Sequence, residues 1–190
     1  MITNGQISDN YNWLNKPDYS VTDGILTIQT SPGTDYWQRT HYGFQRDNAH
    51  ALVREIAVDF VMCVRTQFHP HSQYDQCGLL VRADAENWLK CSVEYETSSH
   101  SRLGSVVTNN GYSDWATIDI TEPLNTMYYR IRRDGSDFIV EYSRNGSNYH
   151  QQRIAHLHGD RQSLLAGIYA CSPMQGSFEA KFSDFTLTVR

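Results

Sequence analysis

The chain has 190 residues, of which 39% are hydrophobic and 12% aromatic, so it is long enough to bury a core without disulfides or metals. Its 16 basic and 21 acidic residues give a formal net charge of -5 at pH 7. A nucleic-acid binder needs a basic surface that displaces counterions from phosphate, and attachment to an anionic membrane needs basic residues too. The composition therefore argues against nucleic-acid and membrane partners, and the length fits one domain, residues 1–190.

The first residues of the chain contain no basic segment followed by an apolar one, so they predict no secretory signal. No stretch approaches the ~20 consecutive apolar residues that span a bilayer. We therefore expect a cytoplasmic protein. No Cys-x-x-Cys pair occurs, which argues against zinc and redox sites, so we expect reduced thiols in apolar surroundings. The sequence also lacks a phosphate-binding glycine loop, a His-Glu-x-x-His motif and a short Asp-rich calcium loop, so we expect neither a metal nor a cofactor. The four cysteines are Cys63, Cys77, Cys91 and Cys171.

Apolar and polar residues alternate with a period of two along much of the chain, which is typical of half-buried β-strands. A short strand is expected at Ile25–Thr27, after the turn pair Asp23-Gly24. A longer strand is expected over Glu55–Arg65, where every second residue from Ile56 to Val64 is apolar. No helical stripe is present, so the pattern indicates an all-β sandwich or barrel. Further alternating segments are 77–81, 89–95, 129–131, 138–142 and 178–182.

Turn residues predict how several of these strands pair. Asp134-Gly135 is expected to form a two-residue turn, which places Ile131 opposite Phe138. Asn145-Gly146 is expected to form the next turn in the same way, with Tyr142 opposite Tyr149. Asn109-Asn110-Gly111 marks a third turn. The segments between 129 and 149 are therefore predicted to form three consecutive strands of an antiparallel meander.

The segment from Tyr74 to Glu96 contains two strands around a turn at Asp84-Ala85-Glu86. This turn pairs Gln76 with Glu94, Gly78 with Ser92 and Arg82 with Trp88. One face of the pair is apolar and predicted to face the core. The other face combines an indole ring, an amide, a cation and carboxylates, which fits either the floor of a carbohydrate-binding groove or an ordinary solvated face with a Lys90–Glu94 ion pair.

Two further segments carry aromatic residues beside polar or turn residues. Pro32–Thr40 contains Asp35 and Trp37, and Gly111–Trp115 follows the third turn. Aromatic loops of this kind suit carbohydrate binding, and they equally suit covers that seal the ends of a sandwich.

A series of motifs extends over nearly the whole chain: Gly24–Ile28, Thr34–Thr40, Tyr74–Arg82, Glu86–Lys90, Ser105–Asn109, Ser113–Trp115 and Gly167–Pro173. Their order and spacing resemble an uncharacterised family related to the fungal regulation-of-enolase protein, within the concanavalin A-like lectin/glucanase superfamily. The resemblance implies a jelly-roll sandwich of two curved antiparallel sheets, whose concave sheet binds glycans in relatives with known ligands. The fungal protein's name also implies a metabolic enzyme as a partner.

Three functions remain open from the sequence. The first is non-catalytic binding of a carbohydrate or small polyol, with Trp37 and Trp88 stacking on the ligand. The second is a glycosidase-like hydrolase, with Glu94 as general base or nucleophile and Glu96 or Asp35 as acid. Superfamily glucanases carry acidic residues at i, i+2 and i+4 of one strand, and here Ser92 occupies the first of those positions. The third is a regulatory protein that docks on a metabolic enzyme. In the binding hypothesis, the groups that donate or accept hydrogen bonds are Gln76, Lys90, Glu94 and Arg130.

Overall fold

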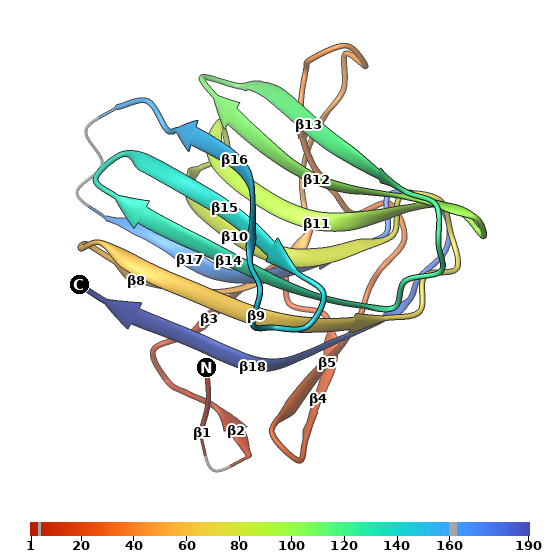
Figure 1. Ribbon diagram of the computed structural model, residues 1–190, viewed down its shortest axis with the longest axis horizontal. Helices are drawn as coiled ribbons and strands as arrows, with labels where there is room; N and C mark the ends of the chain where they lie inside the picture. The colour runs from red at the N-terminus through yellow and green to blue at the C-terminus, as the bar shows by residue number, and fades with distance from the viewer. Residues whose placement is uncertain (4, 160–162) are drawn as a thin grey trace.

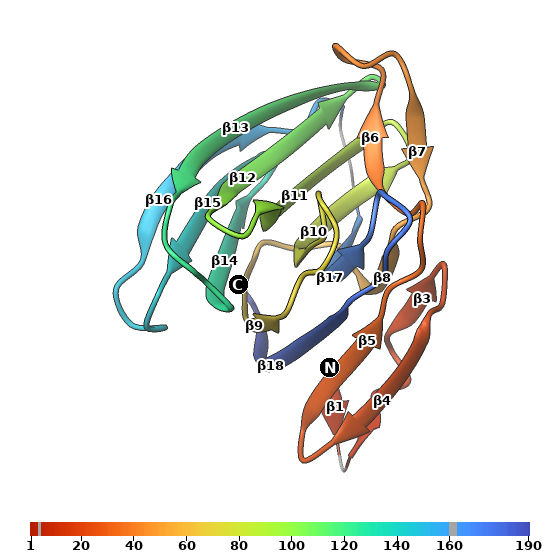
Figure 2. The same cartoon turned by 90° about the vertical axis from the view of Figure 1, so that its right-hand side faces the viewer.

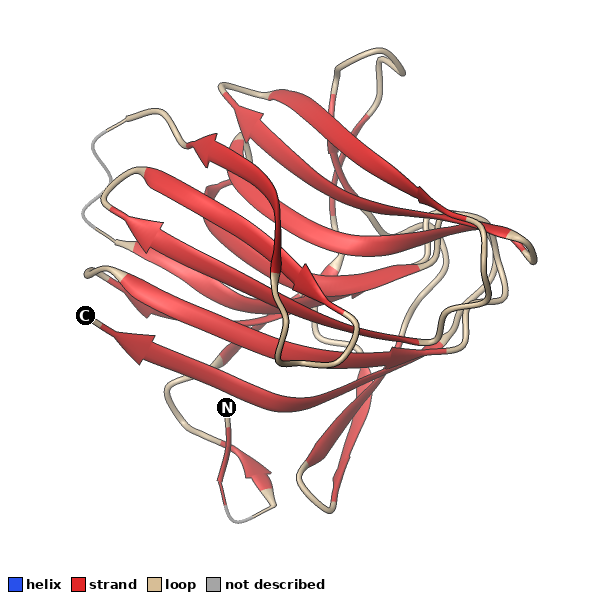
Figure 3. Ribbon diagram, viewed as in Figure 1, coloured by secondary structure: helices blue, strands red, loops and turns tan. Residues whose placement is uncertain are grey.

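The computed structural model describes residues 1–3, 5–159 and 163–190, and all regular elements in those ranges are β-strands (Figures 1 and 3). Two seven-stranded antiparallel sheets pack face to face, which confirms the predicted all-β sandwich of two curved sheets (Figure 2). The first, here called the site sheet, has the spatial order β13 (Tyr112–Ile120), β12 (His100–Asn109), β11 (Asn87–Thr97), β10 (Gln76–Asp84), β17 (Leu164–Cys171), β8 (His50–Ile56) and β3 (Asn12–Leu14). The second, the back sheet, has the order β16 (His150–His156), β15 (Asp137–Ser143), β14 (Thr126–Asp134), β9 (Phe60–Phe68), β18 (Glu179–Val189), β5 (Ile25–Gln29) and β4 (Asp18–Thr22).

Two short hairpins lie outside these sheets. One is formed by β1 (Ile2–Thr3) and β2 (Gln6–Ile7), and the other by β6 (Tyr36–Gln38) and β7 (Gln45–Asp47). The β6–β7 hairpin covers part of the outer face of the site sheet, because the ring of Tyr36 packs against Trp88 on β11 and Tyr169 on β17, at centroid distances of 5.8 and 6.3 Å. The hairpin therefore creates a second layer of packing on the side of the sheet that faces away from the main core.

The main core lies between the two sheets and follows the predicted period of two. On β9, buried residues alternate with half-buried ones along the whole strand, and Phe60, Met62 and Val64 are at most 1% exposed. Burial of alternate side chains removes apolar area from water, at roughly 25 cal/mol per Å². This burial is what holds the two sheets together.

The single strand expected over Glu55–Arg65 is instead two strands in different sheets. β8 ends at Ile56 and β9 begins at Phe60; Val58, in the connection, is 47% exposed. The alternation stays in phase across the connection, so the side-chain pattern alone does not reveal the break. The prediction of one strand was wrong because period two reports which face is buried, and it says nothing about which sheet a residue joins.

The register predicted for two hairpins was also wrong. In the β14–β15 hairpin Asp134 pairs with Asp137, which leaves Gly135 and Ser136 as the loop, and Ile131 faces Val140 instead of Phe138. A shift of two residues keeps the same side chains on the core face, so the hydrophobic pattern fits both registers. The next turn is longer than expected, and Tyr142 pairs with His150 instead of Tyr149.

The register predicted for β10 and β11 is confirmed, with Gln76 opposite Glu94, Gly78 opposite Ser92 and Arg82 opposite Trp88. The turn at Asn110-Gly111 also forms, with both residues at positive φ, 50° and 76°. The face of β10 and β11 that points away from the core is more buried than expected, because the β6–β7 hairpin covers part of it. Its polar side chains must therefore find partners inside the protein.

Cys77, Cys91 and Cys171 are buried free thiols, as predicted, whereas Cys63 is half-buried. Within the part of the chain that the structure describes, no helix is long and apolar enough to cross a membrane.

Candidate functional site

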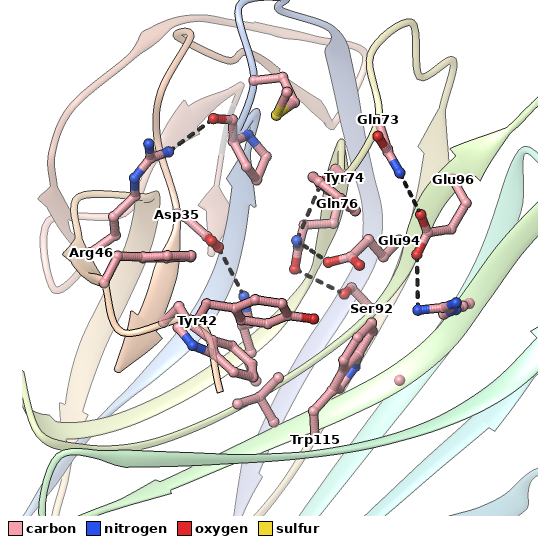
Figure 4. Close-up of a pocket in the computed structure, with 18 residues that line it drawn as sticks. Asp35, Tyr42, Arg46, Gln73, Tyr74, Gln76, Ser92, Glu94, Glu96 and Trp115 are labelled. Atoms are coloured by element: carbon pink, nitrogen blue, oxygen red, sulfur yellow. Dashed lines mark hydrogen bonds and ion pairs between the residues drawn. The ribbon is translucent and has the colours of Figure 1, made fainter. Parts of the chain in front are cut away.

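A pocket of about 420 Å³ opens on the outer face of the site sheet, between the sheet and the β6–β7 hairpin. β10 and β11 supply its polar floor, β12 and β13 one wall, and the β6–β7 hairpin the opposite wall (Figure 4). Loops before β10 and after β17 close the remaining side. The lining residues are Asp35, Trp37, Tyr42, Phe44, Arg46, Gln73, Tyr74, Gln76, Lys90, Ser92, Glu94, Glu96, Arg102, Gly104, Val106, Trp115, Pro173 and Met174.

Lys90 and Asp35 form a buried ion pair in this pocket. Lys90 Nζ lies 3.2 Å from Asp35 Oδ1, and the two side chains are 4% and 11% exposed. Burial is the largest single effect and disfavours the charged ammonium, but the charge and hydrogen bond of Asp35, together with Cys171 and Glu94, outweigh it and hold the pKa of Lys90 above its ordinary value. The ammonium also lies over the rings of Trp88 and Tyr169, at 5.8 and 5.5 Å. Lys90 is therefore charged, and the carboxylate of Asp35 balances most of its charge.

Glu94 is held in place by the amide of Gln76, whose Nε2 donates to Glu94 Oε2 at 2.7 Å. The same nitrogen donates to the carbonyl of Tyr74 at 3.2 Å. Gln76 Oε1 accepts hydrogen bonds from Tyr169 at 2.9 Å and from Ser92 at 3.4 Å. Both the nitrogen and the oxygen of the Gln76 amide therefore have hydrogen-bond partners, which fix the orientation of this side chain. Gln76 in turn positions the carboxyl group of Glu94.

Glu94 has a strongly altered acidity. Burial raises its pKa to about 8, and the carboxylates of Asp35 and Glu96 act in the same direction, while Lys90 and the Gln76 hydrogen bond oppose the rise. Burial has this effect because it disfavours the charged form of a carboxyl group. Glu94 is therefore mainly protonated at pH 7, and its carboxyl group can donate a hydrogen bond as well as accept one.

Glu96 lies at the end of the pocket beyond Glu94 and forms an ion pair with a neighbouring cation. Arg102 NH1 on β12 lies 3.2 Å from Glu96 Oε1, and Gln73 Nε2 donates to Glu96 Oε2 at 2.9 Å. Figure 4 shows that Glu96 turns toward Gln73, whereas Glu94 turns toward Gln76. The two carboxyl groups on one strand thus occupy different electrostatic environments.

Aromatic side chains form the walls above this floor. Trp37 is 8% exposed, and its indole Nε1 donates to the carbonyl of Thr40 at 3.0 Å. Its ring meets Trp115 and Tyr42 edge to face, at centroid distances of 6.5 and 5.3 Å. Tyr42 is 55% exposed and Phe44 41%, so the mouth of the pocket presents apolar ring surface to solvent.

Most of the residues selected from the sequence meet in this pocket. Of the proposed ligand-binding residues, Trp37, Gln76, Lys90 and Glu94 line it, and so do the candidate carboxylates Glu96 and Asp35. Lys90 is more deeply buried than a solvated groove floor implies, and it pairs with Asp35 instead of Glu94.

The structure does not bring Trp88 and Arg130 to the pocket. Trp88 is 0% exposed, because Tyr36 covers its ring, so it cannot stack on a ligand. Arg130 lies on β14 of the back sheet, where it forms a bidentate ion pair with Glu141 at 2.6 and 2.9 Å and lies 4.0 Å from the ring of Tyr149. The sequence placed Trp88 correctly on the outer face, but it did not reveal that the hairpin buries this ring.

Several lining residues were missed in the sequence. Tyr42, Phe44 and Arg46 come from a segment with no strand alternation that could have marked it. In the register of β11 and β12, Arg102 lies directly opposite Glu94. The turn between these strands, residues 98–99, contains no Gly or Pro that would indicate this register. Only the fold brings these residues to the same face.

Within the described residues, no group of three or more His, Cys, Asp or Glu side chains is arranged to hold a metal ion. The pocket instead combines a protonated carboxyl group, two ion pairs and exposed aromatic rings. These groups can bind hydroxyl groups and apolar ring faces of a small molecule.

Comparison with known proteins agrees with this fold. The chain is 34% identical over 177 residues to "Regulation of enolase protein 1" of Saccharomyces cerevisiae, covering 93% of this chain and 88% of the yeast protein. A crystal structure of a functionally unknown protein from Saccharomyces cerevisiae superposes with a TM-score of 0.88 at 34% identity, over 95% of this chain and 97% of that one.

More distant structures share only the fold. The K247S mutant of the GH43 protein BlXynB from Bacillus licheniformis matches with a TM-score of 0.75 at 16% identity, over 98% of this chain and 38% of that one. An alginate lyase from Klebsiella pneumoniae matches with a TM-score of 0.64 at 11% identity, over 92% of this chain and 85% of the lyase. The family described as "Protein of unknown function (DUF1349)" matches residues 13–189. The chain therefore belongs to the DUF1349 family, as the motifs in its sequence indicated.

Proposed function

We propose that the protein binds a carbohydrate or a similar small polyol in the pocket between the β6–β7 hairpin and the site sheet. The observation that carries this proposal is that aromatic rings and hydrogen-bonding groups face the same cavity of about 420 Å³. Pockets for small molecules are typically concave, with apolar walls and a few convergent polar groups. The volume is sufficient for a small saccharide.

The pocket presents aromatic rings and hydrogen-bonding groups on different sides, and this arrangement supports a saccharide in particular. Trp37, Tyr42 and Trp115 offer ring surface to the apolar face of a sugar. The protonated carboxyl group of Glu94 donates to a hydroxyl oxygen, and Ser92 both donates and accepts. Because Gln76 already orients Glu94, the binding group is held in one position before the ligand arrives, which reduces the entropy lost on binding.

The test is calorimetric titration of the protein with a panel of neutral and acidic mono- and oligosaccharides. We expect at least one saccharide to bind with a Kd near or below about 1 mM, which corresponds to about -4 kcal/mol. Tyr42→Ala, at the pocket mouth, should weaken this binding. Tyr112→Ala is the matched control, because Tyr112 is a similarly exposed tyrosine at 63% that does not line the pocket. Absence of binding across the panel refutes the proposal.

The hydrolase interpretation of the same site remains a prediction. Glu94 has the raised pKa that a general acid needs, but Asp35 and Glu96 are each paired with a cation. Incubation of a bound oligosaccharide with wild-type protein and with Glu94→Gln tests it. Cleavage by the wild type that Glu94→Gln abolishes supports hydrolysis, and cleavage that survives in Glu94→Gln removes Glu94 from that role.

A second candidate function is regulation of a metabolic enzyme by docking. It is favoured by the name of the yeast relative, "Regulation of enolase protein 1", which is 34% identical to this chain. Sedimentation of the purified protein with purified enolase from the same organism tests it. A stable complex with altered enolase turnover supports docking, and independent sedimentation of the two proteins contradicts it.

A further inference from the structure

The pocket contains one cation, Arg46, for which the described part of the chain supplies no acidic partner. Arg46 on β7 donates from NH1 to the carbonyl of Pro173 at 2.8 Å, and its guanidinium lies 5.6 Å from the ring centroid of Phe44. These contacts hold the side chain at the pocket but leave most of its five N–H donors unused. Among the described residues, no carboxylate forms an ion pair with it.

The acidic groups around Arg46 are committed elsewhere. Asp47, its neighbour in sequence, is bound by Arg82. Asp35 pairs with Lys90 and Glu96 pairs with Arg102. Arg46 and Glu96 lie toward opposite sides of the pocket, with Glu94 between them (Figure 4). The positive charge of Arg46 is therefore not cancelled by the two ion pairs.

The remaining acid, Glu94, does not restore the balance at neutral pH. Its pKa is raised to about 8, chiefly by burial. The three cations that line the pocket therefore face two ion-paired carboxylates, those of Asp35 and Glu96. The surplus is local, because the chain as a whole carries a formal charge of -5. The charged and titratable groups that line the pocket around Glu94 or lie against its floor are Lys90 and Glu96 on β11, Arg102 on β12, Tyr169 and Cys171 on β17, Asp35 before β6, Arg46 on β7 and Tyr74 before β10.

We propose that the ligand of this pocket is a saccharide or polyol that carries an anionic group, a carboxylate or a phosphate, and that Arg46 binds this group. The proposal rests on the saccharide-binding function proposed above and adds the chemical class of the ligand. The planar guanidinium suits either anion, because two parallel N–H groups match two oxygens of a carboxylate or a phosphate. The aromatic walls and Glu94 then contact the uncharged part of the same molecule.

The experiment compares matched ligands on the wild-type protein by calorimetric titration in a buffer without phosphate or carboxylate. The two series are glucose, glucuronate and glucose 6-phosphate, and galactose, galacturonate and galactose 1-phosphate. We expect at least one acidic member to bind at least about tenfold more tightly than its neutral sugar, from the strength of hydrogen bonds to charged groups. Whether the uronate or the phosphate binds more tightly identifies the anion.

Two variants locate the effect. Arg46→Gln should remove the tenfold preference for the acid, whereas Arg39→Gln should keep it, because Arg39 lies on the same hairpin but pairs with Glu86 outside the pocket. A second measurement needs no variant: added NaCl should weaken binding of the acidic ligand to the wild type and leave that of the neutral sugar almost unchanged.

The outcomes separate this inference from the proposed function. If neutral sugars bind as tightly as their acids, the anion proposal is wrong and saccharide binding stands. If neither neutral nor acidic sugars bind, both proposals fail. A preference for the acid that persists in folded Arg46→Gln would overturn the role of Arg46.

Discussion

Lys90 Nζ and Asp35 Oδ1 lie 3.2 Å apart and join the β6–β7 hairpin segment to the middle of the site sheet. Asp35 also accepts a hydrogen bond from the backbone N–H of Tyr36 at 2.7 Å, so its orientation is set by its own hairpin. This pair determines where the hairpin covers the sheet and where the pocket begins.

Breaking this ion pair should destabilise the protein strongly. Lys90→Met leaves the Asp35 carboxylate without its partner, and Asp35→Asn leaves the ammonium without its own, each at an expected cost of about 3–5 kcal/mol in the free energy of unfolding. The double variant should cost clearly less than the sum of the two single variants, because no unpaired charge remains. Urea denaturation of all four proteins measures this. Additive effects would contradict a direct coupling between the two groups.

The raised pKa of Glu94 predicts how stability depends on pH. The folded protein holds the proton up to about pH 8, whereas the unfolded chain loses it near the ordinary value of 4.5. The contribution of Glu94 to stability is therefore complete below pH 4.5 and decreases as the pH rises to about 8, with a slope of at most about 1.4 kcal/mol per pH unit.

Glu94→Gln should remove this contribution, because the amide does not titrate. The measurement is the difference in unfolding free energy between wild type and Glu94→Gln at several pH values from 5 to 8, a range that lies between the ordinary pKa and the raised pKa of Glu94. The difference should shift in favour of the variant as the pH rises. Glu86→Gln is the control, because the Glu86 side chain is 51% exposed. A difference that does not vary with pH would show that Glu94 has an ordinary pKa.

Trp88 and Trp115 should respond differently to truncation. Trp88 is fully buried, so Trp88→Ala should cost about 3–5 kcal/mol of stability. Trp115 is half-buried and lines the pocket, so Trp115→Ala should lower ligand affinity with a smaller loss of stability. Thermal unfolding and calorimetric titration of both variants distinguish the roles. A folded Trp88→Ala protein with selectively lost binding would restore the direct role that the sequence suggested for this ring.

Gly78 should not tolerate a side chain. A Cβ atom at this position would lie 1.9 Å from the backbone oxygen of Cys91 on β11, so Gly78→Ala forces neighbouring strands apart at an expected cost of about 3 kcal/mol. Ser20→Ala on the exposed edge strand β4 is the control and should change stability little. Unfolding free energies from chemical denaturation test the difference. Equal stability of the two variants would mean that β10 and β11 are less closely packed than the structure indicates.

Local pattern was sufficient for several features of the fold. Period two identified the core-facing residues of β9, β10 and β11, and the turn at Asp84-Ala85-Glu86 established the register that places Gln76 opposite Glu94. Motif resemblance identified the sandwich. These features depend on neighbouring residues and on which side of a strand is apolar, so they can be predicted from the order of residues in the sequence.

Tertiary structure decided the remaining features. The break between Ile56 and Phe60 and the two-residue shift that pairs Ile131 with Val140 leave the buried faces unchanged, so no side-chain pattern distinguishes them. The burial of Trp88 and the pairing of Lys90 with Asp35 depend on a hairpin far away in sequence that folds over the sheet. The sequence by itself determined which residues share a face of each strand. Packing decided which of those faces is covered and which charged groups on it are paired. The reason is that burial and electrostatic interactions depend on distances in space.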